Sequence, residues 1–231
     1  MTPQRLPERE MIDELGRTPG RGTFEAHVTI VAGDIAERER FRAACTNLGV
    51  KCVLIELPQG ATRSQPMTST YHRGDLADVI REVAALADAV RRAGFEVSRV
   101  KLEAVTSNEG VPASDEEAAH FPAGNYFEFH AKVTLPVRAD LAPLSALCAS
   151  HQAHLSSNAF ESDDVGCERF VSLRVFEAGR VRAERAFDAL LADLDGAGYA
   201  VTNRLREYTI YDSNRRVDAG WIDAPSEVGT P

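Results

Sequence analysis

The sequence has few features of a membrane or secreted protein. No apolar run approaches the roughly 20 residues that a transmembrane helix needs, and residues 1–23 lack the apolar stretch of a signal peptide. The cysteines, Cys45, Cys52, Cys148 and Cys167, show no CxxC spacing, which favours free thiols over a zinc knuckle or a disulfide framework. We therefore expect a cytoplasmic protein without a membrane segment.

Positive charge is also scarce. The formal net charge is -9 at pH 7, and the only lysines are Lys51, Lys101 and Lys132. Such a chain creates no overall field that would attract nucleic acid or an anionic membrane surface, so we expect a small-molecule partner instead. Hydrophobic residues make up 44% of the 231 residues, enough for a substantial core in one large domain or two small ones. A homodimer remains open.

The chain contains an internal repeat. "FEAHVTI" (24–30) and "FEFHAKVTL" (127–135) share a pattern of phenylalanine, glutamate and histidine. Cys45, Gly94 and Glu103 follow His27 at almost the same separations as Cys148, Gly198 and Glu207 follow His130. The two halves can therefore be aligned with each other along most of their length.

Each half predicts the element order βαββαβ, which is that of a ferredoxin-like unit. The fold we expect is α+β, a tandem duplication of this unit with antiparallel sheets. The "GAGYAV" and "RAGFEV" segments place a glycine where the second helix of each half ends. In the first half we expect strands at 24–31, 50–57, 65–72 and 96–105 and helices at 35–48 and 75–93; in the second, strands at 126–135, 153–160, 168–176 and 200–211 and helices at 139–151 and 180–196.

The units are separated by a segment rich in acid, glycine and proline. We predict the following division: 1–22 an N-terminal tail, 23–105 the first unit, 106–124 a linker, 125–221 the second unit and 222–231 a C-terminal tail.

Side chains alternate across a strand, so Phe24, Ala26, Val28 and Ile30 share one face while Glu25, His27 and Thr29 share the other. Both helices of a ferredoxin-like unit cover one face of its sheet, which must be the apolar face. Glu25 and His27, like Glu128 and His130 in the second half, should therefore lie on the open face. The open faces of two fused units commonly meet in a barrel or cleft.

The first and last strands of such a unit are neighbours. This arrangement predicts that Lys101 and Glu103 lie beside Glu25 and His27, with Glu207 in the matching place in the second half. One conflict remains in the last strand: the alternation that turns Glu207 to the open face turns Arg204 and Arg206 towards the helices. Either that strand contains a bulge or the register there is different.

"HVTI" (27–30) resembles the His-x-Thr-x element of the 2H phosphoesterases, in which two such strands face each other across a cleft. The resemblance implies that His27 and His130 are the general base and general acid, and that Thr29 contacts the phosphate. The second element differs, because "HAKV" has Lys132 where a threonine belongs. A lysine can still stabilise a phosphoryl oxyanion as a point charge.

Other resemblances imply other chemistry. The set His27, Glu103, His130 and Glu207 is similar to the metal ligands of the vicinal oxygen chelate proteins, which implies one divalent metal, although those modules are βαβββ. "EFHAK" is similar to the Glu-x-Glu-x-Lys strand of the triphosphate tunnel enzymes, with His130 in place of an acid. "QPMTSTYHRG" and "YDSNRRVDAGWI" look like segments of uncharacterised bacterial proteins sometimes labelled ankyrin, but no 33-residue ankyrin period is present.

These observations predict a small-molecule enzyme with its cleft between the two units, and phosphoester hydrolysis without a cofactor as its leading activity. A noncatalytic ligand-binding protein and a His/Glu metal enzyme are the alternatives. His72 and Trp221 receive no role. We expect His27 and His130 to be catalytic, and the substrate to be bound by Glu25, Thr29, Ser69, Tyr71, Lys101, Glu103, Glu128 and Lys132.

Overall fold

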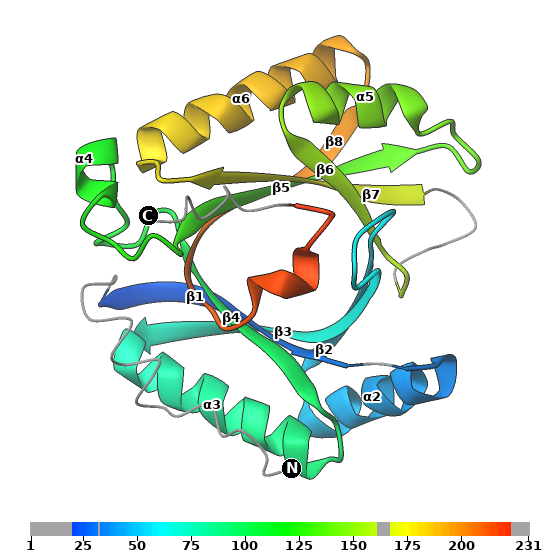
Figure 1. Cartoon of the computed structure of the whole chain (residues 1–231), viewed down its shortest axis with the longest axis vertical. Coiled ribbons are helices and arrows are strands. Elements are labelled where there is room, and N and C mark those ends of the chain that lie inside the picture. The colour runs from blue at the N-terminus through cyan, green and yellow to red at the C-terminus, as the bar shows by residue number, and fades with distance from the viewer. Residues whose placement is uncertain (1–19, 32, 161–166, 223–231) are drawn as a thin grey trace, which may run out of the picture.

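A computed structural model describes residues 20–222, except residue 32 and residues 161–166. Eight antiparallel strands there form one closed sheet with helices on its outside (Figure 1). The chain is therefore a mixed α and β protein. Along the chain the elements are β1 Arg21–Ile30, α2 Ile35–Leu48, β2 Lys51–Glu56, β3 Ser64–Asp75, α3 Leu76–Arg92, β4 Val97–Val105, α4 Asp115–Ala118, β5 Tyr126–Leu135, α5 Ala142–Ser150, β6 Ala153–Asn158, β7 Cys167–Phe176, α6 Arg180–Gly196, β8 Ala200–Asp212 and the 3-10 helix η1 Arg215–Asp218.

Every helix and strand that the sequence predicts is present, with small shifts at the ends. The predicted helices at 35–48 and 180–196 coincide with α2 and α6. The α5 helix begins at Ala142 rather than at 139, because Pro143 occupies its first turn and Asp140 accepts a hydrogen bond from the Ala142 amide. Two elements are additional, helix α4 inside the predicted linker and the 3-10 helix η1 after β8.

The strands follow the order β1-β3-β2-β6-β7-β5-β8-β4 around the closed sheet. Each half of the chain contributes one continuous block, β4-β1-β3-β2 and β8-β5-β7-β6, so the two blocks have the same internal order. The blocks join where β4 pairs with β8 and where β2 pairs with β6. The open faces thus meet as the inner wall of one barrel.

The hydrophobic core lies between the outer face of the barrel and the helices. Helices α2 and α3 cover the first block, and α5 and α6 cover the second (Figure 1). Phe24 and Val28 of β1 and Phe127 and Phe129 of β5 are fully buried there, as the alternation predicts. The Phe129 ring lies 5.2 Å from that of Phe187 on α6, centroid to centroid.

The second helix of each half ends at a glycine, as predicted. Gly94 follows α3 and Gly198 follows α6, with φ of 87° and 80°. Both residues adopt the left-handed conformation that glycine accepts at little cost. The next residues, Phe95 and Tyr199, each donate a backbone hydrogen bond back into the last turn of the helix.

The structured body extends slightly beyond the predicted boundaries. Arg21 and Gly22 belong to β1 and pair with Asp75 and Gly74, and Ile222 is buried. Within the predicted linker, the Asn108 side chain hydrogen-bonds both the amide and the carbonyl of Thr23. Most of the predicted tails, residues 1–19 and 223–231, lie outside the described residues.

The segment after β8 turns back towards the barrel. Figure 1 shows η1 in the middle of the ring of strands. The Asp218 carboxylate is buried and accepts hydrogen bonds from Gln65 of β3 and Arg174 of β7. Trp221 packs with Leu57 and Ile222 in a small second core. Trp221 also lines the lumen.

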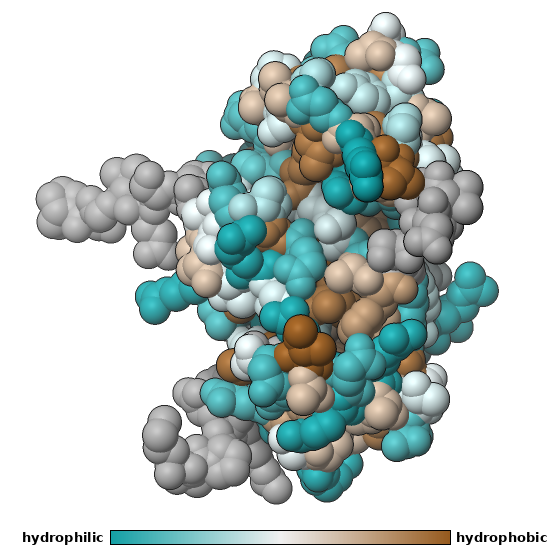
Figure 2. All heavy atoms as spheres, turned by 90° about the vertical axis from the view of Figure 1, so that its right-hand side faces the viewer, coloured by the Kyte–Doolittle hydropathy of each residue, from teal (hydrophilic) through white to brown (hydrophobic). Residues whose placement is uncertain are grey.

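Hydrophilic residues cover much of the face seen in Figure 2, with hydrophobic residues in small groups between them. Among the exposed large hydrophobic side chains, Ile35, Tyr71 and Val181 lie on three different elements, and Ile35 and Leu48 lie at opposite ends of α2. No helix in the described part of the chain is long and apolar enough to cross a bilayer.

Replacing Gly179 by alanine should lower the free energy of unfolding. A Cβ at this position would overlap the backbone of Ser114, so α6 and the segment before α4 would have to separate, at a cost of about 1–3 kcal/mol. Gly196→Ala is the matched control, because a Cβ there meets nothing within 4 Å, and alanine in a helix is about 1 kcal/mol better than glycine. Urea unfolding followed by circular dichroism measures both variants. Equal stability of the two would contradict the packing described.

Candidate functional site

The barrel encloses a cavity of about 270 Å³. Side chains from all eight strands line it, as do Asp218 and Trp221 from the C-terminal segment. Eight-stranded barrels have interiors that side chains fill or that hold one small ligand. Every candidate residue of the sequence analysis lies on this wall: Glu25, His27, Thr29, Ser69, Tyr71, Lys101, Glu103, Glu128, His130, Lys132 and Glu207.

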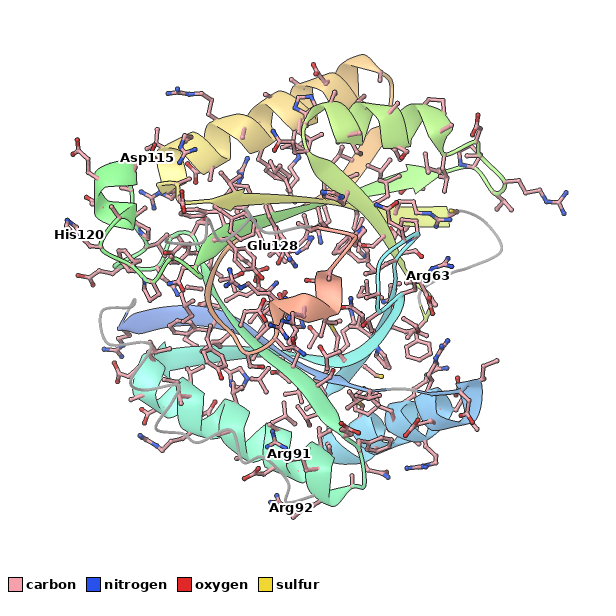
Figure 3. All side chains as sticks on the ribbon, viewed as in Figure 1. Arg63, Arg91, Arg92, Asp115, His120 and Glu128 are labelled. Carbon is pink, nitrogen blue, oxygen red and sulfur yellow. The ribbon has the colours of Figure 1, made fainter. Side chains whose placement is uncertain are left out.

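The closed sheet explains why these residues converge. Alternate side chains of each strand point inward, and closure brings all the inward rows around one axis. In Figure 3 the Glu128 side chain lies near the middle of the ring, whereas Arg91 and Arg92 lie at the outer end of α3. The two Glu-x-His rows therefore face a shared interior.

The pairing of first and last strands is as predicted. Glu25 lies opposite Glu103 and His27 opposite Lys101 across β1 and β4. In the second half Glu128 lies opposite Glu207 across β5 and β8. The position opposite His130 is Leu205, so Lys101 has no basic counterpart in the second half.

The last strand does contain a β-bulge, but Arg204 and Arg206 stay on its outer face, since Asn203, Leu205 and Glu207 line the lumen. Leu102 pairs with Tyr211 and Glu103 with Thr209, so Ile210 is an extra residue in the ladder. Alternation turns Glu207 and Thr209 to the lumen and Tyr208 and Ile210 to the outer core, and the bulge brings Tyr211 to the outer core as well. The Arg206 side chain lies outside, over the Phe187 ring and bonded to Asp188.

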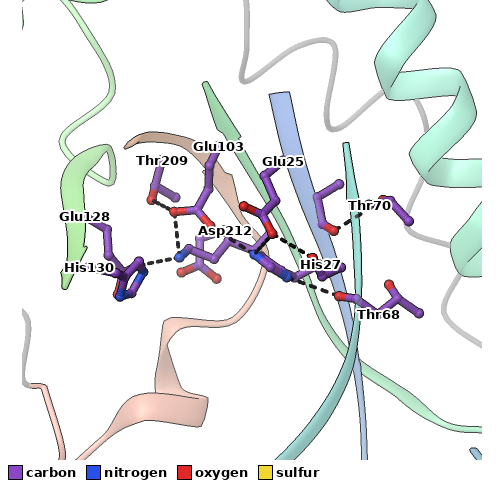
Figure 4. Close-up of polar contacts among 12 residues, drawn as sticks. Glu25, His27, Thr68, Thr70, Glu103, Glu128, His130, Thr209 and Asp212 are labelled. Atoms are coloured by element: carbon purple, nitrogen blue, oxygen red, sulfur yellow. Dashed lines mark hydrogen bonds and ion pairs between the residues drawn. The ribbon is translucent and has the colours of Figure 1, made fainter. Parts of the chain in front are cut away.

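Lys101 is the centre of a buried charge network. Its Nζ lies 2.7 Å from Glu103 Oε1, and it also donates to Glu128 Oε2 (Figure 4). Thr209 Oγ1 donates to Glu103 at 3.0 Å. Burial raises the pKa values of both carboxyl groups, but the charge of Lys101, with that of Arg174 at Glu128, outweighs burial and leaves them below the usual value. Lys101 therefore joins a carboxylate of each half as ionised pairs.

Two arginines extend this network, and sequence reasoning missed both. Arg99 binds Asp212 through two nitrogens, at 2.8 and 2.5 Å, and its Nη1 lies 3.0 Å from Asp218. Arg174 donates to Glu128 at 2.8 Å and to Asp218 at 2.7 Å. The repeat could have indicated Arg174, because it follows Glu128 at the separation at which Tyr71 follows Glu25. Asp218 lies beyond the repeat and had no such signal.

His27 is held between a carbonyl and two carboxylates. Its Nδ1 lies 3.1 Å from the Thr68 carbonyl, and its Nε2 lies 3.4 Å from Glu103 Oε2 and 3.6 Å from Glu25 Oε1 (Figure 4). Burial by itself lowers the pKa of His27, but the Glu103 hydrogen bond and the charges of Glu25 and Glu103 outweigh it and raise the pKa above the usual value. The arrangement favours the imidazolium form.

The surroundings of His130 shift its pKa in the opposite direction. Its Nδ1 lies 2.8 Å from Ser172 Oγ, and its ring meets Phe170 edge to face. Burial lowers the pKa of His130, and the charge of Glu128 opposes this effect without cancelling it. The pKa values of the two histidines are therefore shifted in opposite directions although both rings line one cavity.

Among the carboxylates of this wall, Glu25 and Glu207 have the fewest cations and hydrogen-bond donors around them. Ser69 Oγ donates to Glu25 Oε1 at 2.7 Å. Glu25 Oε2 and Glu207 Oε1 are buried without a hydrogen-bond partner among the described residues, as is the Thr29 hydroxyl. Burial, together with the charges of Glu103 and Glu25, raises the pKa of Glu207 well above the usual value.

The remaining candidates lie at less central positions. Lys132 lies 3.0 Å from Glu168 and over the Phe170 ring. Tyr71 is 62% exposed although it lines the cavity. His72 points outside the barrel, where its Nδ1 lies 2.7 Å from Glu82 of α3, so it connects β3 to the helix layer.

The metal alternative gains no support from the arrangement of its residues. His27, Glu103, His130 and Glu207 all line the cavity. Within residues 20–222, as far as they are described, no group of three or more His, Cys, Asp or Glu side chains is arranged to hold a metal ion. Lys101 Nζ lies 2.7 Å from Glu103 Oε1, so Glu103 already has a cationic partner.

Comparison with known proteins adds no further assignment. No protein-family model matches the chain, and a search of curated proteins finds no match.

Replacing Lys101 by methionine should strongly destabilise the fold. Glu103 and Glu128 would remain buried without their shared cation, and breaking a buried pair in this way costs about 3–5 kcal/mol. Lys51→Met is the matched control, since Lys51 is exposed at the start of β2. The free energy of unfolding from guanidinium titration measures both. A Lys101 variant as stable as the control would show that the network contributes little.

At neutral pH, nuclear magnetic resonance of ¹⁵N-labelled imidazoles should show His27 protonated and His130 neutral. The carboxylates beside His27 and the burial of His130 cause the difference. His27→Gln and His130→Gln each remove one set of signals and so assign the spectrum. The same protonation state at both rings would contradict the predicted difference between His27 and His130.

Proposed function

We propose that this chain is a small-molecule enzyme that carries out acid–base catalysis inside the barrel. The observation that supports the proposal is the pair of histidines with opposite pKa shifts on the wall of one cavity. Pairs of titratable groups whose environments separate their pKa values are typical of acid and base partners. In this proposal the imidazolium of His27 is the acid and the neutral His130 is the base.

Phosphoester hydrolysis is the reaction we propose to test first. His130 accepts a proton from the attacking water, whose oxygen forms a new bond to phosphorus. The bond between phosphorus and the leaving oxygen breaks, and His27 gives its proton to that oxygen. The buried Thr29 hydroxyl, which lacks a partner among the described residues, supports this version because it is free to donate to a phosphoryl oxygen. Lys132 would stabilise the developing negative charge as a point charge.

Noncatalytic ligand binding is the second candidate. The observation in its favour is that several lumen charges already have ion-pair partners, among them Lys101, Arg99 and Arg174. A pure binding protein would show a higher melting temperature with its ligand but no turnover.

We also infer that the fold arose from tandem duplication of a ferredoxin-like unit. The identical strand order of the two blocks supports this inference, as do the equivalent glycines after α3 and α6. The free thiols of Cys45, Cys52, Cys148 and Cys167 support a reducing, cytoplasmic environment for the protein.

His27→Ala and His130→Ala should each lower kcat for phosphodiester hydrolysis by about 10²- to 10⁴-fold, the usual contribution of a general acid or base. The wild-type rate should fall below the lowered pKa of His130, where the base is protonated. It should also fall above the raised pKa of His27, where the acid is lost. A panel of cyclic phosphates and phosphodiesters, assayed across pH, measures both effects.

The control for these variants is His151→Ala, because His151 pairs with Asp193 outside the barrel. It should retain wild-type activity. Wild-type protein that is inert on the whole panel would exclude the phosphoester version, and full activity in either lumen variant would exclude the acid–base roles.

A further inference from the structure

Most carboxylates of the lumen have a permanent cation as partner. Glu103 and Glu128 share Lys101, Asp212 binds Arg99, and Asp218 binds both Arg99 and Arg174. Glu25 and Glu207 are different. The basic side chain next to Glu25 is His27, 3.6 Å away, and Glu207 has no ion pair within the described part of the chain.

Both of these carboxylates are deeply buried and incompletely satisfied. Glu25 is 5% exposed and Glu207 is 1% exposed. One oxygen of each, Glu25 Oε2 and Glu207 Oε1, lacks a hydrogen-bond donor from any described residue, and both side chains line the cavity. A buried acceptor without a donor is unfavourable, so these oxygens form a place where a ligand's donors would be stabilising.

Burial and the charges of Glu103 and Glu25 raise the pKa of Glu207 well above its usual value, whereas His27, Ser69 and Tyr71 outweigh burial and lower the pKa of Glu25. The Glu207 and Glu25 side chains lie within hydrogen-bond reach of each other. Without a ligand, the donor that these two oxygens can obtain from the described residues is therefore a proton shared between them, as in paired carboxyl groups elsewhere. The other titratable groups that face this pair are His27 of β1, Tyr71 of β3, Lys101 and Glu103 of β4 and Glu128 of β5.

We propose that Glu25 and Glu207 bind the ammonium group of a small primary amine, which makes the substrate of this cavity a cationic or zwitterionic molecule. The inference rests on the proposed function, because it assigns the substrate class of the same chamber. A primary ammonium group has three N–H donors and can serve both orphan oxygens. On binding, R–NH₃⁺ enters between the carboxylates and the Glu207 proton leaves to solvent, so the charge of the site is conserved.

The position of the pair also orients such a substrate. Glu25, His27 and Thr29 form one inward row along β1, and a strand advances about 3.3 Å per residue. Glu25 lies at one end of the row, His27 in the middle and Thr29 at the other end. An ammonium group held by Glu25 and Glu207 would direct the rest of the molecule past His27 towards the Thr29 hydroxyl.

Isothermal titration calorimetry with ethylamine, phosphoethanolamine and ethyl phosphate as probes tests the proposal. The two amines should bind, with up to about one proton released per ligand in buffers of different ionisation enthalpy, and their affinity should rise with pH. Glu207→Gln should weaken amine binding about 10- to 100-fold, the value of a charge-assisted hydrogen bond, and should abolish the proton release. Glu82→Gln, outside the barrel, is the matched control and should behave as wild type.

Glutamine reproduces the shape of the protonated carboxyl group, so the Glu207 variant should fold, and thermal melting checks this. If the Glu207 variant does not fold, amine binding is measured with Glu25→Gln instead. Absence of amine binding to the wild type, or unchanged binding in the glutamine variant, would overturn the proposal. So would equal affinity for ethyl phosphate and phosphoethanolamine.

Failure of this inference can be separated from failure of the proposed function. His130→Ala should lose hydrolysis and keep amine binding, because His130 does not contact Glu25 or Glu207 in the described structure. Amine binding without any hydrolysis would reject the proposed reaction alone. If the rate of hydrolysis is the same for substrates with and without an amine, and is unchanged in Glu207→Gln, the ammonium site alone is rejected.

Discussion

The salt bridges of Lys101 with Glu103 and Glu128 are the interactions on which the rest of the lumen depends. Glu103 belongs to the first half and Glu128 to the second, so one ammonium group connects the two blocks inside the barrel. Removing two carboxylates and a cation from water is unfavourable unless they pair closely. Arg174 and Asp218 continue the network to η1, so the same constraint also holds the segment after β8.

The network makes the two halves unequal although the chain repeats itself. Lys101 of the first half corresponds to Leu205 of the second, and Arg174 of the second corresponds to Tyr71 of the first. Consequently Glu128 is surrounded by cations, whereas its counterpart Glu25 is bound by a hydroxyl and a histidine. Burial lowers the pKa of His130, whereas the carboxylates beside His27 outweigh burial and raise its pKa. A symmetric fold thus provides an asymmetric cavity.

Much of the fold followed from local patterns. Alternation identified the inward and outward faces of β1 and β5, and the apolar stripe of α3 and the stops at Gly94 and Gly198 marked helix positions. The β8 strand was the exception, since a bulge at Ile210 changes the alternation and no local signal marks it. A bulge is an extra residue in the pairing of two strands, so it is a property of the partner β4 as much as of β8.

The sequence by itself determined which side chains face inward, because strand alternation is a local consequence of backbone geometry. It thereby indicated the row of Glu25 and His27, its counterpart in Glu128 and His130, and the neighbours Lys101 and Glu103. Only the tertiary structure decided which of these charges neutralise one another and which remain unsatisfied. Pairing depends on distances between strands that closure of the barrel sets, and on Asp218, which returns to the lumen from beyond the repeat.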